Sequence, residues 1–400
     1  MSTSELVDAH SIDPPPPSRP PVRVWLGVLS LALGAAIIVT TEFTPVGFLP
    51  NVSRDLDVSL GTAGLMVLVP GLSAAVAAPL VVVGSGRLDR RLLIVVLSVL
   101  VLLSNGVAAV APNFGVVVVA RVFLGVAIGG FWAVVPSLGF RLAGPRAGTR
   151  ATSIILAGLS VGTVVGLPAG QFFGNLIGWR LTFAASAALA ALIGIGQLTV
   201  LPKIPATGRM TFAHLGEVFR VPIARTILIA GGVATTGQFA ASTFVTPFLL
   251  RNAEMSSGFA TVLFIAYGLA GILGTLAGPA LVERDRMLTF AGAAAVFGVV
   301  LASLPALAGA PVLVSVLIGA WGVLWGLVPL ALQTHMLTAT PHAPEAASSI
   351  FITVMQLAIA IGSGVGGVLV DSAGLSTVFV ASGITAIASA FFALLTRHGL

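Results

Sequence analysis

Apolar stretches of about twenty residues recur along nearly the whole chain, and the polar residues gather between them. An α-helix needs about 20 apolar residues to cross a bilayer, so these stretches predict membrane-spanning helices. The stretches are continuous rather than alternating between apolar and polar residues, which argues against a transmembrane β-barrel. Only 8% of the 400 residues are charged, against about 25% in a soluble domain. The sequence therefore predicts an all-α polytopic membrane protein.

The expected helices number twelve and fall into two groups of six, separated by the polar stretch from Pro202 to Pro222. We expect a disordered cytoplasmic tail over residues 1–22 and an N-terminal six-helix half over residues 23–201. A cytoplasmic central loop over residues 202–223 then leads to a C-terminal six-helix half over residues 224–400. We expect the helices at about 24–49, 60–83, 92–111, 115–138, 149–173, 180–201, 224–250, 257–282, 288–308, 311–337, 346–370 and 376–396.

The basic residues test this topology, because cytoplasmic loops of membrane proteins are enriched in Lys and Arg. With both termini cytoplasmic, 15 of the 19 Lys and Arg residues fall on the cytoplasmic side. One helix more or fewer would destroy this asymmetry. The same rule accounts for the high isoelectric point without nucleic acid as a partner. We expect a multi-pass protein of the plasma or inner membrane with both termini in the cytoplasm.

An internal repeat relates the two groups of helices. A single offset of 196 residues aligns loop, glycine and aromatic positions of the second half with those of the first. Parallel repeats of this kind place a substrate site near the membrane midplane between the halves, which move around it. The aligned positions include Asp89-Arg90 with Asp285-Arg286, Glu42-Phe43 with Gln238-Phe239, Gly166 with Gly362, and Phe183 with Phe379.

Glu42 is the only carboxylate inside the expected helices, and Arg121 is the only cation expected deep within one. An ionisable group in the membrane costs about 2.5–3.5 kcal/mol even on the lenient insertion scale, so such residues are functional candidates. Both lie at a similar depth near the outer ends of their helices, so they should pair directly or communicate through water and polar neighbours. One interpretation is proton coupling, and the other is a structural ion pair. The repeat partner of Glu42 is Gln238, which cannot titrate, so coupling is expected in the first half.

Several motifs resemble the major facilitator superfamily over residues 23–397, and more narrowly the twelve-helix drug:proton antiporters, in the branch that holds bacterial chloramphenicol, sugar and nucleoside efflux proteins. Thr40-Thr41-Glu42-Phe43 and Gly47-Phe48-Leu49-Pro50 are similar to that branch's first helix. Arg121-x-x-x-Gly125-x-x-x-Gly129 is similar to the family motif whose arginine is associated with proton coupling. The resemblance implies alternating access by two six-helix halves.

Two further motifs concern conformational change. The glycine stripe of the fifth expected helix resembles the motif associated with exporters, and it can serve close packing or a hinge. The loop after the second helix is a degenerate version of the superfamily's loop motif, with Gly86 where the usual acid stands, so gating and simple positive-inside topology are both open. The residues concerned are Gly158, Gly162, Gly166, Pro168 and Gly170 in the helix, and Asp89, Arg90 and Arg91 in the loop.

Polar and aromatic residues inside the helices that should line the centre are the candidates for substrate binding. Such a lining suits amphipathic molecules that are neutral or cationic, although each aromatic ring can instead pack or face lipid. The candidates are Phe43, Phe131, Trp132, Gln238, Phe239, Thr243, Trp321, Trp325, Gln333 and Gln356.

The function expected from these features is export of a small organic molecule (drug-like, antibiotic, sugar or nucleoside) in exchange for protons. The alternatives are a proton-coupled or facilitative importer of a sugar or metabolite, and a non-transporting receptor or scaffold. The chain has no cysteine, no GxxxxGK[ST] loop and no His spacing typical of a metal site, so we expect neither an enzyme nor a cofactor. The expected partners are a small-molecule substrate, protons and membrane lipids, and the protein is expected to be a monomer.

Overall fold

The computed structural model describes residues 21–85, 88–205, 216–340 and 344–397. These residues form helices joined by short turns, with no β-strand among them. Short elements are α2 (Leu60–Ala63), α9 (Val245–Arg251) and the 3-10 turn η1 (Pro305–Leu307). The long helices are α1 (Val22–Asp55), α3 (Leu65–Gly84), α4 (Arg90–Ala109), α5 (Phe114–Leu176), α6 (Trp179–Val200), α8 (Pro222–Thr243), α10 (Ser257–Val282), α11 (Arg286–Ser303), α12 (Pro311–Ala339), α13 (Pro344–Ala373) and α14 (Leu375–Arg397).

The expected set of twelve spans is present in the described part of the chain. Eleven helical segments are long and apolar enough to cross a membrane, and α8 with α9, bent by 44°, supplies a twelfth. Two of the spans belong to α5, which is helical throughout except at Gly144 (φ 71°, ψ 178°). The expected boundary between the two spans, between residues 138 and 149, contains this break at Gly144, although the residues on either side of it are helical. The all-α membrane architecture is confirmed. Of the expected loops and tail, residues 1–20, 86–87 and 206–215 lie outside the described residues.

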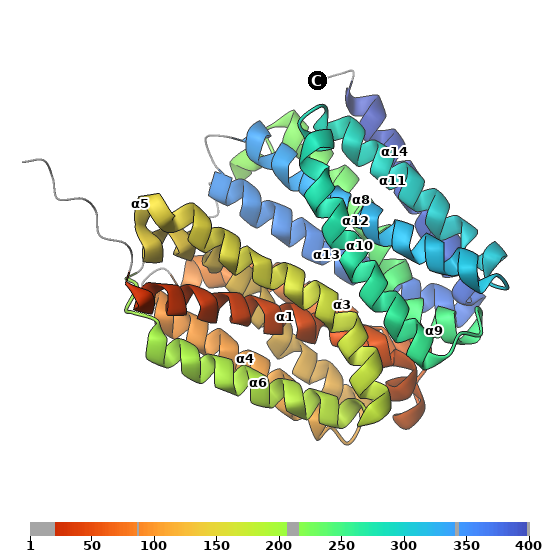
Figure 1. Cartoon of the computed structure of the whole chain (residues 1–400), viewed down its shortest axis with the longest axis horizontal. Coiled ribbons are helices and arrows are strands. Elements are labelled where there is room, and N and C mark those ends of the chain that lie inside the picture. Colours follow the sequence, from red (N-terminus) through yellow and green to blue (C-terminus); the bar gives the residue numbers. More distant parts are fainter. Residues whose placement is uncertain (1–20, 86–87, 206–215, 341–343, 398–400) are drawn as a thin grey trace, which may run out of the picture.

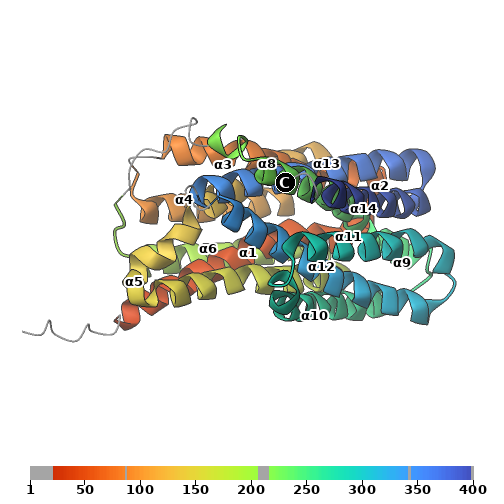
Figure 2. The same cartoon turned by 90° about the horizontal axis from the view of Figure 1, so that it is seen from above.

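The helices gather into two bundles (Figures 1 and 2). Helices α1 to α6 pack mainly on one another, and α8 to α14 form the second bundle. The bundles meet through α3 and α2 against α13, α5 against α10, and α1 against α9. Figure 1 shows them approaching one another toward the end that carries α9. The boundary between the halves is therefore formed by α1, α2, α3 and α5 on one side and by α9, α10 and α13 on the other, and a site between the halves must lie along it.

The halves approach one another closely at the junction of α2 with α13. Asp371 accepts hydrogen bonds from the Ser59 hydroxyl and from the Gly61 backbone N–H (2.9 Å). The backbones of Gly61 and Gly367 are so near that a Cβ added at Gly367 would lie 2.8 Å from the Gly61 carbonyl oxygen. One carboxylate and two positions without side chains therefore contribute to the contact between α2 and α13.

Backbone geometry confirms the 196-residue repeat. Phe48 interrupts the helical dihedral angles of α1 (φ −119°, ψ 19°), and Phe244, its repeat partner, separates α8 from α9 (φ −109°, ψ 14°). Gly178 and Gly374 have nearly the same left-handed conformation, with φ of 83° and 84°. Residues with a Cβ rarely adopt that conformation, which explains why glycine stands at both turns.

Helix packing follows the same repeat. In the first half, Gly166 and Gly170 of α5 lie against Thr40 and Thr44 of α1, so closely that a Cβ at Gly166 would be 3.4 Å from the Thr40 carbonyl oxygen. Small residues let membrane helices approach backbone to backbone. The contacts recur 196 residues later between α13 and α8, as Gly362 against Thr236 and Gly366 against Ala240.

Candidate functional site

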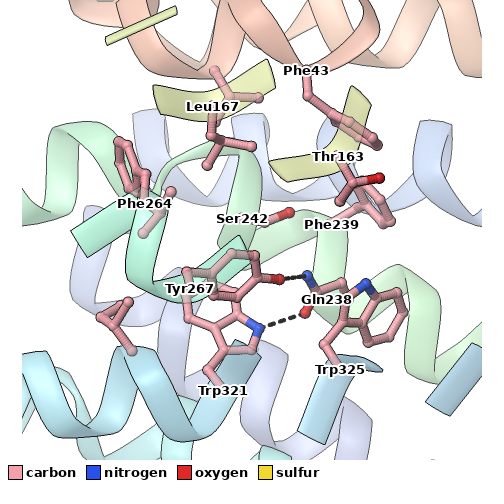
Figure 3. A pocket seen from close by; sticks show the side chains of 13 residues that line it. Phe43, Thr163, Leu167, Gln238, Phe239, Ser242, Phe264, Tyr267, Trp321 and Trp325 are labelled. Carbon is pink, nitrogen blue, oxygen red and sulfur yellow. Dashed lines mark hydrogen bonds between the residues drawn. The ribbon is translucent and has the colours of Figure 1, made fainter. Parts of the chain in front are cut away.

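A pocket of about 50 Å³ lies between the two bundles (Figure 3). The N-terminal half contributes the side chains on one wall, from α1 and α5, and the C-terminal half contributes the remainder from α8, α9, α10 and α12. The lining residues are Phe43, Val46, Thr163, Leu167, Gln238, Phe239, Ser242, Val245, Phe264, Tyr267, Ile318, Trp321 and Trp325.

Gln238 is held in a fixed orientation in this pocket. The Trp321 indole Nε1–H donates to Gln238 Oε1 (2.6 Å), and Gln238 Nε2 donates to the Tyr267 hydroxyl (3.0 Å) (Figure 3). An indole can only donate, so the amide oxygen must face Trp321 and the amide nitrogen must face Tyr267. Gln238 is 2% exposed, and satisfying a buried amide in this way avoids the cost of unpaired polar atoms.

Aromatic rings from both halves meet on the pocket wall. Phe43 of α1 stacks on Phe239 of α8, with ring centroids 5.8 Å apart and an interplanar angle of 22°. Trp325 of α12 meets Phe239 edge-on at 6.2 Å. Five of the ten expected binding residues thus line one pocket. Tyr267 was missed by the sequence interpretation, although it is the only tyrosine of the chain.

The other five expected binding residues lie outside the lining. Phe131 and Trp132 pack together in the core of the N-terminal half, with ring centroids 5.7 Å apart. Thr243 is fully buried and hydrogen-bonded to Ser363 (2.9 Å) between α8 and α13. Gln333 is exposed on α12, and Gln356 is buried against Glu42.

Glu42 lies at the boundary between the halves. Its Oε1 accepts a hydrogen bond from Gln356 Nε2 of α13 (3.3 Å), and the two side chains are 5% and 8% exposed. Phe43, the next residue of α1, lines the pocket. The Glu42 side chain therefore lies outside the pocket lining, next in sequence to Phe43, which belongs to it.

Arg121 is fully buried and connects three helices without pairing with Glu42. Its Nε donates to the Met66 carbonyl of α3 (3.1 Å) and its Nη2 to the Thr41 carbonyl of α1 (3.0 Å). Nη1 has no hydrogen-bond partner among the described residues. An ion pair is present elsewhere, between Arg180 and Asp55. Of the two expected arrangements, the structure has the indirect one, in which Arg121 binds the carbonyl of the residue that precedes Glu42.

The glycine stripe of α5 packs on α1 along its length. A Cβ at Gly162 would lie 2.7 Å from the Ala36 carbonyl oxygen, and Gly158 lies directly against Ala32. The helix continues through Pro168, and its interruption is at Gly144 instead. Close packing is thus a property of this stripe, and a hinge role for it stays a prediction.

The loop before α4 is bound to its own half. Asp89 caps α4 by accepting from the Arg91 N–H (2.8 Å), and it also accepts from the Ile204 N–H (3.0 Å). Arg90 donates to the Ser85 carbonyl (3.1 Å) and hydroxyl (2.8 Å), and it is 8% exposed. Arg90 is therefore a second buried cation, at the first residue of α4 rather than deep within a helix. Arg91 donates to the carbonyl of Leu198, again within the first half.

Comparison with known proteins agrees with this architecture. The family model described as Major Facilitator Superfamily matches residues 31–362. The chain belongs to the major facilitator superfamily. It is accordingly a multi-pass membrane transporter rather than an enzyme.

Two curated relatives from this superfamily cover nearly the whole chain. It is 31% identical over 380 residues to the transcription regulatory protein OpdE of Pseudomonas aeruginosa, covering 94% of each chain. It is also 31% identical over 359 residues to the purine ribonucleoside efflux pump NepI of Escherichia coli, covering 90% of this chain and 91% of NepI.

Solved structures of the superfamily share the fold. The nucleoside transporter NupG superposes with a TM-score of 0.78 at 14% identity, over 93% of this chain and 99% of NupG. A D-xylose–proton symporter superposes with a TM-score of 0.70 at 17% identity, over 93% and 96% of the two chains. At these identities the likeness concerns the fold alone.

Proposed function

We propose that this superfamily member exports a small organic molecule from the cytoplasm in exchange for protons. The observation that carries the proposal is the buried carboxylate of Glu42, which contacts Gln356 across the boundary between the halves. A buried acid at the surface where two moving bodies meet can make their contact depend on its protonation.

The chemistry of that contact supports coupling. The Glu42 carboxylate accepts from the Gln356 amide, and a hydrogen bond to an ionised group is about twice as strong as a neutral one. Protonation turns one carboxyl oxygen into a donor, weakens this bond and removes the cost of a buried charge. Gln356, expected from the sequence to bind substrate, is therefore better placed as a coupling residue.

Transmission to the substrate would pass through α1. Phe43 adjoins Glu42 and stacks on Phe239 of the other half. A shift of α1 that follows protonation changes the pocket wall directly. Arg121 stays in place in this scheme, because its two carbonyl bonds tie α1 to α3 independently of the proton.

Direction and substrate are proposed from the relatives and motifs. The glycine stripe of α5 resembles the exporter motif, and NepI is named as an efflux pump for purine ribonucleosides. With both termini in the cytoplasm, as the basic residues predict, α2 and α9 lie at the outer face. Purine ribonucleosides are the first substrates to test.

Everted membrane vesicles test both coupling and direction. With the interior acidified, radiolabelled inosine should accumulate, and purified protein in weak buffer should release protons when inosine is added. Glu42→Gln should abolish both signals. Uptake that ignores the proton gradient would refute the antiport proposal, and accumulation in right-side-out vesicles driven by an inward gradient would reverse the direction.

A second function, signalling to transcription, has support in the name of the OpdE relative. Transcript levels in cells that carry wild-type protein, Glu42→Gln or no protein separate the two. Regulation that persists in a variant without transport would identify a receptor, whereas regulation lost with transport would follow from substrate movement.

A further inference from the structure

We propose that the C-terminal wall of the pocket binds an uncharged, planar heteroaromatic ring, and that Tyr267 determines this specificity. The inference rests on the proposed transport function and specifies its substrate class. Three observations support it. The wall has aromatic residues at positions where the first half has glycine, the lining residues are uncharged, and two hydroxyl groups of the lining have no acceptor among the described residues.

The internal repeat relates the aromatic residues of this wall to glycines of the first half. Tyr267, Trp321 and Trp325 stand 196 residues after three glycines. These are Gly71, Gly125 and Gly129 of α3 and α5. The glycines of the first half serve close packing, since a Cβ at Gly71 would be 2.9 Å from the Gln356 carbonyl oxygen and one at Gly129 would be 2.5 Å from that of Ala74.

The second half therefore carries large rings where the first half carries none. Trp321 and Tyr267 meet edge to face, with ring centroids 5.4 Å apart, and both line the pocket. Trp321 is 1% exposed and also packs against Phe297 and Phe379 in the core of the second half, whereas Tyr267 and Trp325 are only partly buried at the pocket. The geometry points to recognition of a ligand surface that aromatic rings complement, which is another ring.

The lining has no formal charge. Figure 3 shows the side chains of its 13 residues, and none is Asp, Glu, Lys, Arg or His. Glu42, the nearest acid in sequence, is bound to Gln356 outside the lining. A charged ligand would lose its hydration without gaining a counter-ion here, so the pocket favours an uncharged one.

The unused polar groups indicate a heteroaromatic ring rather than a hydrocarbon. Tyr267 accepts from Gln238, so its hydroxyl proton is free, and it has no acceptor among the described residues. Ser242 also lines the pocket, and no hydrogen bond of its hydroxyl group is present in the described part of the chain. Two donors in an apolar wall match ring nitrogens or carbonyl oxygens of the ligand.

A ring bound in the pocket could contact both halves through Phe43 and Phe239. Phe43 and Phe239 belong to different halves and lie face to face at 5.8 Å (Figure 3). A planar ring that enters beside them contacts α1 and α8 together, so that binding of the ring favours one relative arrangement of the halves.

Equilibrium binding to the purified protein, measured without any proton gradient, tests the proposal. The probes are adenosine, inosine and uridine as uncharged heteroaromatics, ribose as the ring-free control, and tetraphenylphosphonium as an aromatic cation. We expect the heteroaromatics to bind and the other two to bind at least about tenfold more weakly. Tyr267→Phe should weaken binding about tenfold, equivalent to one hydrogen bond. Trp132→Phe, an aromatic change outside the pocket, should leave the affinity unchanged.

Several outcomes would overturn the proposal. These are equal or tighter binding of tetraphenylphosphonium or ribose, no binding of any heteroaromatic at millimolar concentration, and unchanged affinity in Tyr267→Phe. If that variant does not fold, Ser242→Ala replaces it, with a smaller loss expected. Failure here is distinguishable from failure of the transport proposal. Exchange of tetraphenylphosphonium for protons would refute the heteroaromatic site alone, while tight adenosine binding without proton exchange would refute antiport alone.

Discussion

Helices α1 and α8 are repeat partners in the two halves, and the corresponding residues Glu42 and Gln238 make different contacts. Both positions precede a bend of the helix, at Phe48 and Phe244. Glu42 bonds across the boundary to the other half, whereas Gln238 is held by Trp321 and Tyr267 of its own half. The duplicated scaffold has kept its backbone at these positions, while the first half holds a buried acid and the second half holds an amide among aromatic rings.

The surroundings reinforce this difference. Arg121 has Leu317 as its repeat partner, so no cation stands beside Gln238 in the described structure. An acid at position 238 would have to be buried among aromatic rings without a counter-charge, which is strongly unfavourable. The halves are therefore not interchangeable, and four predictions test how far the difference goes.

The largest effect should come from exchanging the two residues. In Glu42→Gln combined with Gln238→Glu we expect proton-coupled transport to fall to background, because the acid in the second half lacks both Arg121 and Gln356. The measurement is substrate-induced proton release from reconstituted protein. Recovery of coupling in the double variant, relative to Glu42→Gln alone, would show that the halves are equivalent.

Arg121 should contribute more to stability than its repeat partner. Arg121→Met leaves two buried carbonyls unpaired and should lower the free energy of unfolding by about 3 kcal/mol. Arg121→Lys keeps the charge but lacks the planar group that reaches Met66 and Thr41 together, so an intermediate loss is expected. Leu317→Met is the matched control and should cost less than about 1.5 kcal/mol. Urea unfolding in detergent measures all three, and equal losses for Met and Lys would contradict the carbonyl-bond interpretation.

Substituting alanine for glycine should reduce stability more in the glycine stripe of α5 than in that of α13. Gly170 lies against the Thr44 backbone more tightly than Gly366 lies against the Ala240 carbonyl oxygen, where a Cβ would be 3.0 Å away. Gly170→Ala should therefore cost about 1–3 kcal/mol and Gly366→Ala less. Thermal unfolding of both variants compares them. A larger loss for Gly366→Ala would mean that α1 yields more easily than α8.

The smallest effect concerns the contact of the halves at Asp371, whose repeat partner is Asn175. Asp371 uses one carboxylate oxygen for Ser59 and the other for Gly61. Asp371→Asn leaves only one acceptor oxygen and removes the charge, which should weaken this contact by about 1 kcal/mol. The chain has no cysteine, so spin labels at exposed Arg54 and Thr377 can report the separation of the halves. We expect a larger population of long distances in Asp371→Asn and no change in Asn175→Ala.

Much of this fold was accessible from the sequence because a membrane leaves few choices. Backbone groups in lipid must be satisfied within helices, so apolar stretches translate directly into spans. The repeat offset, deduced from matches such as Asp89 with Asp285, proved correct down to the conformation of Gly178 and Gly374. The bends at Phe48 and Phe244 lie close to Pro50 and Pro247, which break the helical hydrogen bonding locally. Their exact positions were not predicted, because α5 continues as a helix through Pro168 and a proline alone does not fix a bend.

The site was only partly predictable, for a different reason. Polarity inside a helix indicates that a residue needs a partner but not which helix supplies it. Gln238 and Gln356 looked alike in sequence, yet one lines the pocket and the other meets Glu42. Phe131 and Phe43 are equally aromatic, and only the packing of α1 against the other half places Phe43 at the pocket. A comparison of the two halves at the 196-residue offset pairs Tyr267 with Gly71, and this large difference in side-chain size was the sequence signal for Tyr267.

The pair Gly61 and Gly367 has a consequence for the energy balance between transport states. A transporter must leave its closed arrangement in every cycle, so attraction at the junction has to stay modest. Here the halves come together because nothing protrudes, and a single methyl group on Gly367 would act as a wedge. Shape therefore contributes to this contact alongside the hydrogen bonds of Asp371, and a larger residue at Gly367 offers a way to hold the protein in one state without changing Glu42 or the pocket lining.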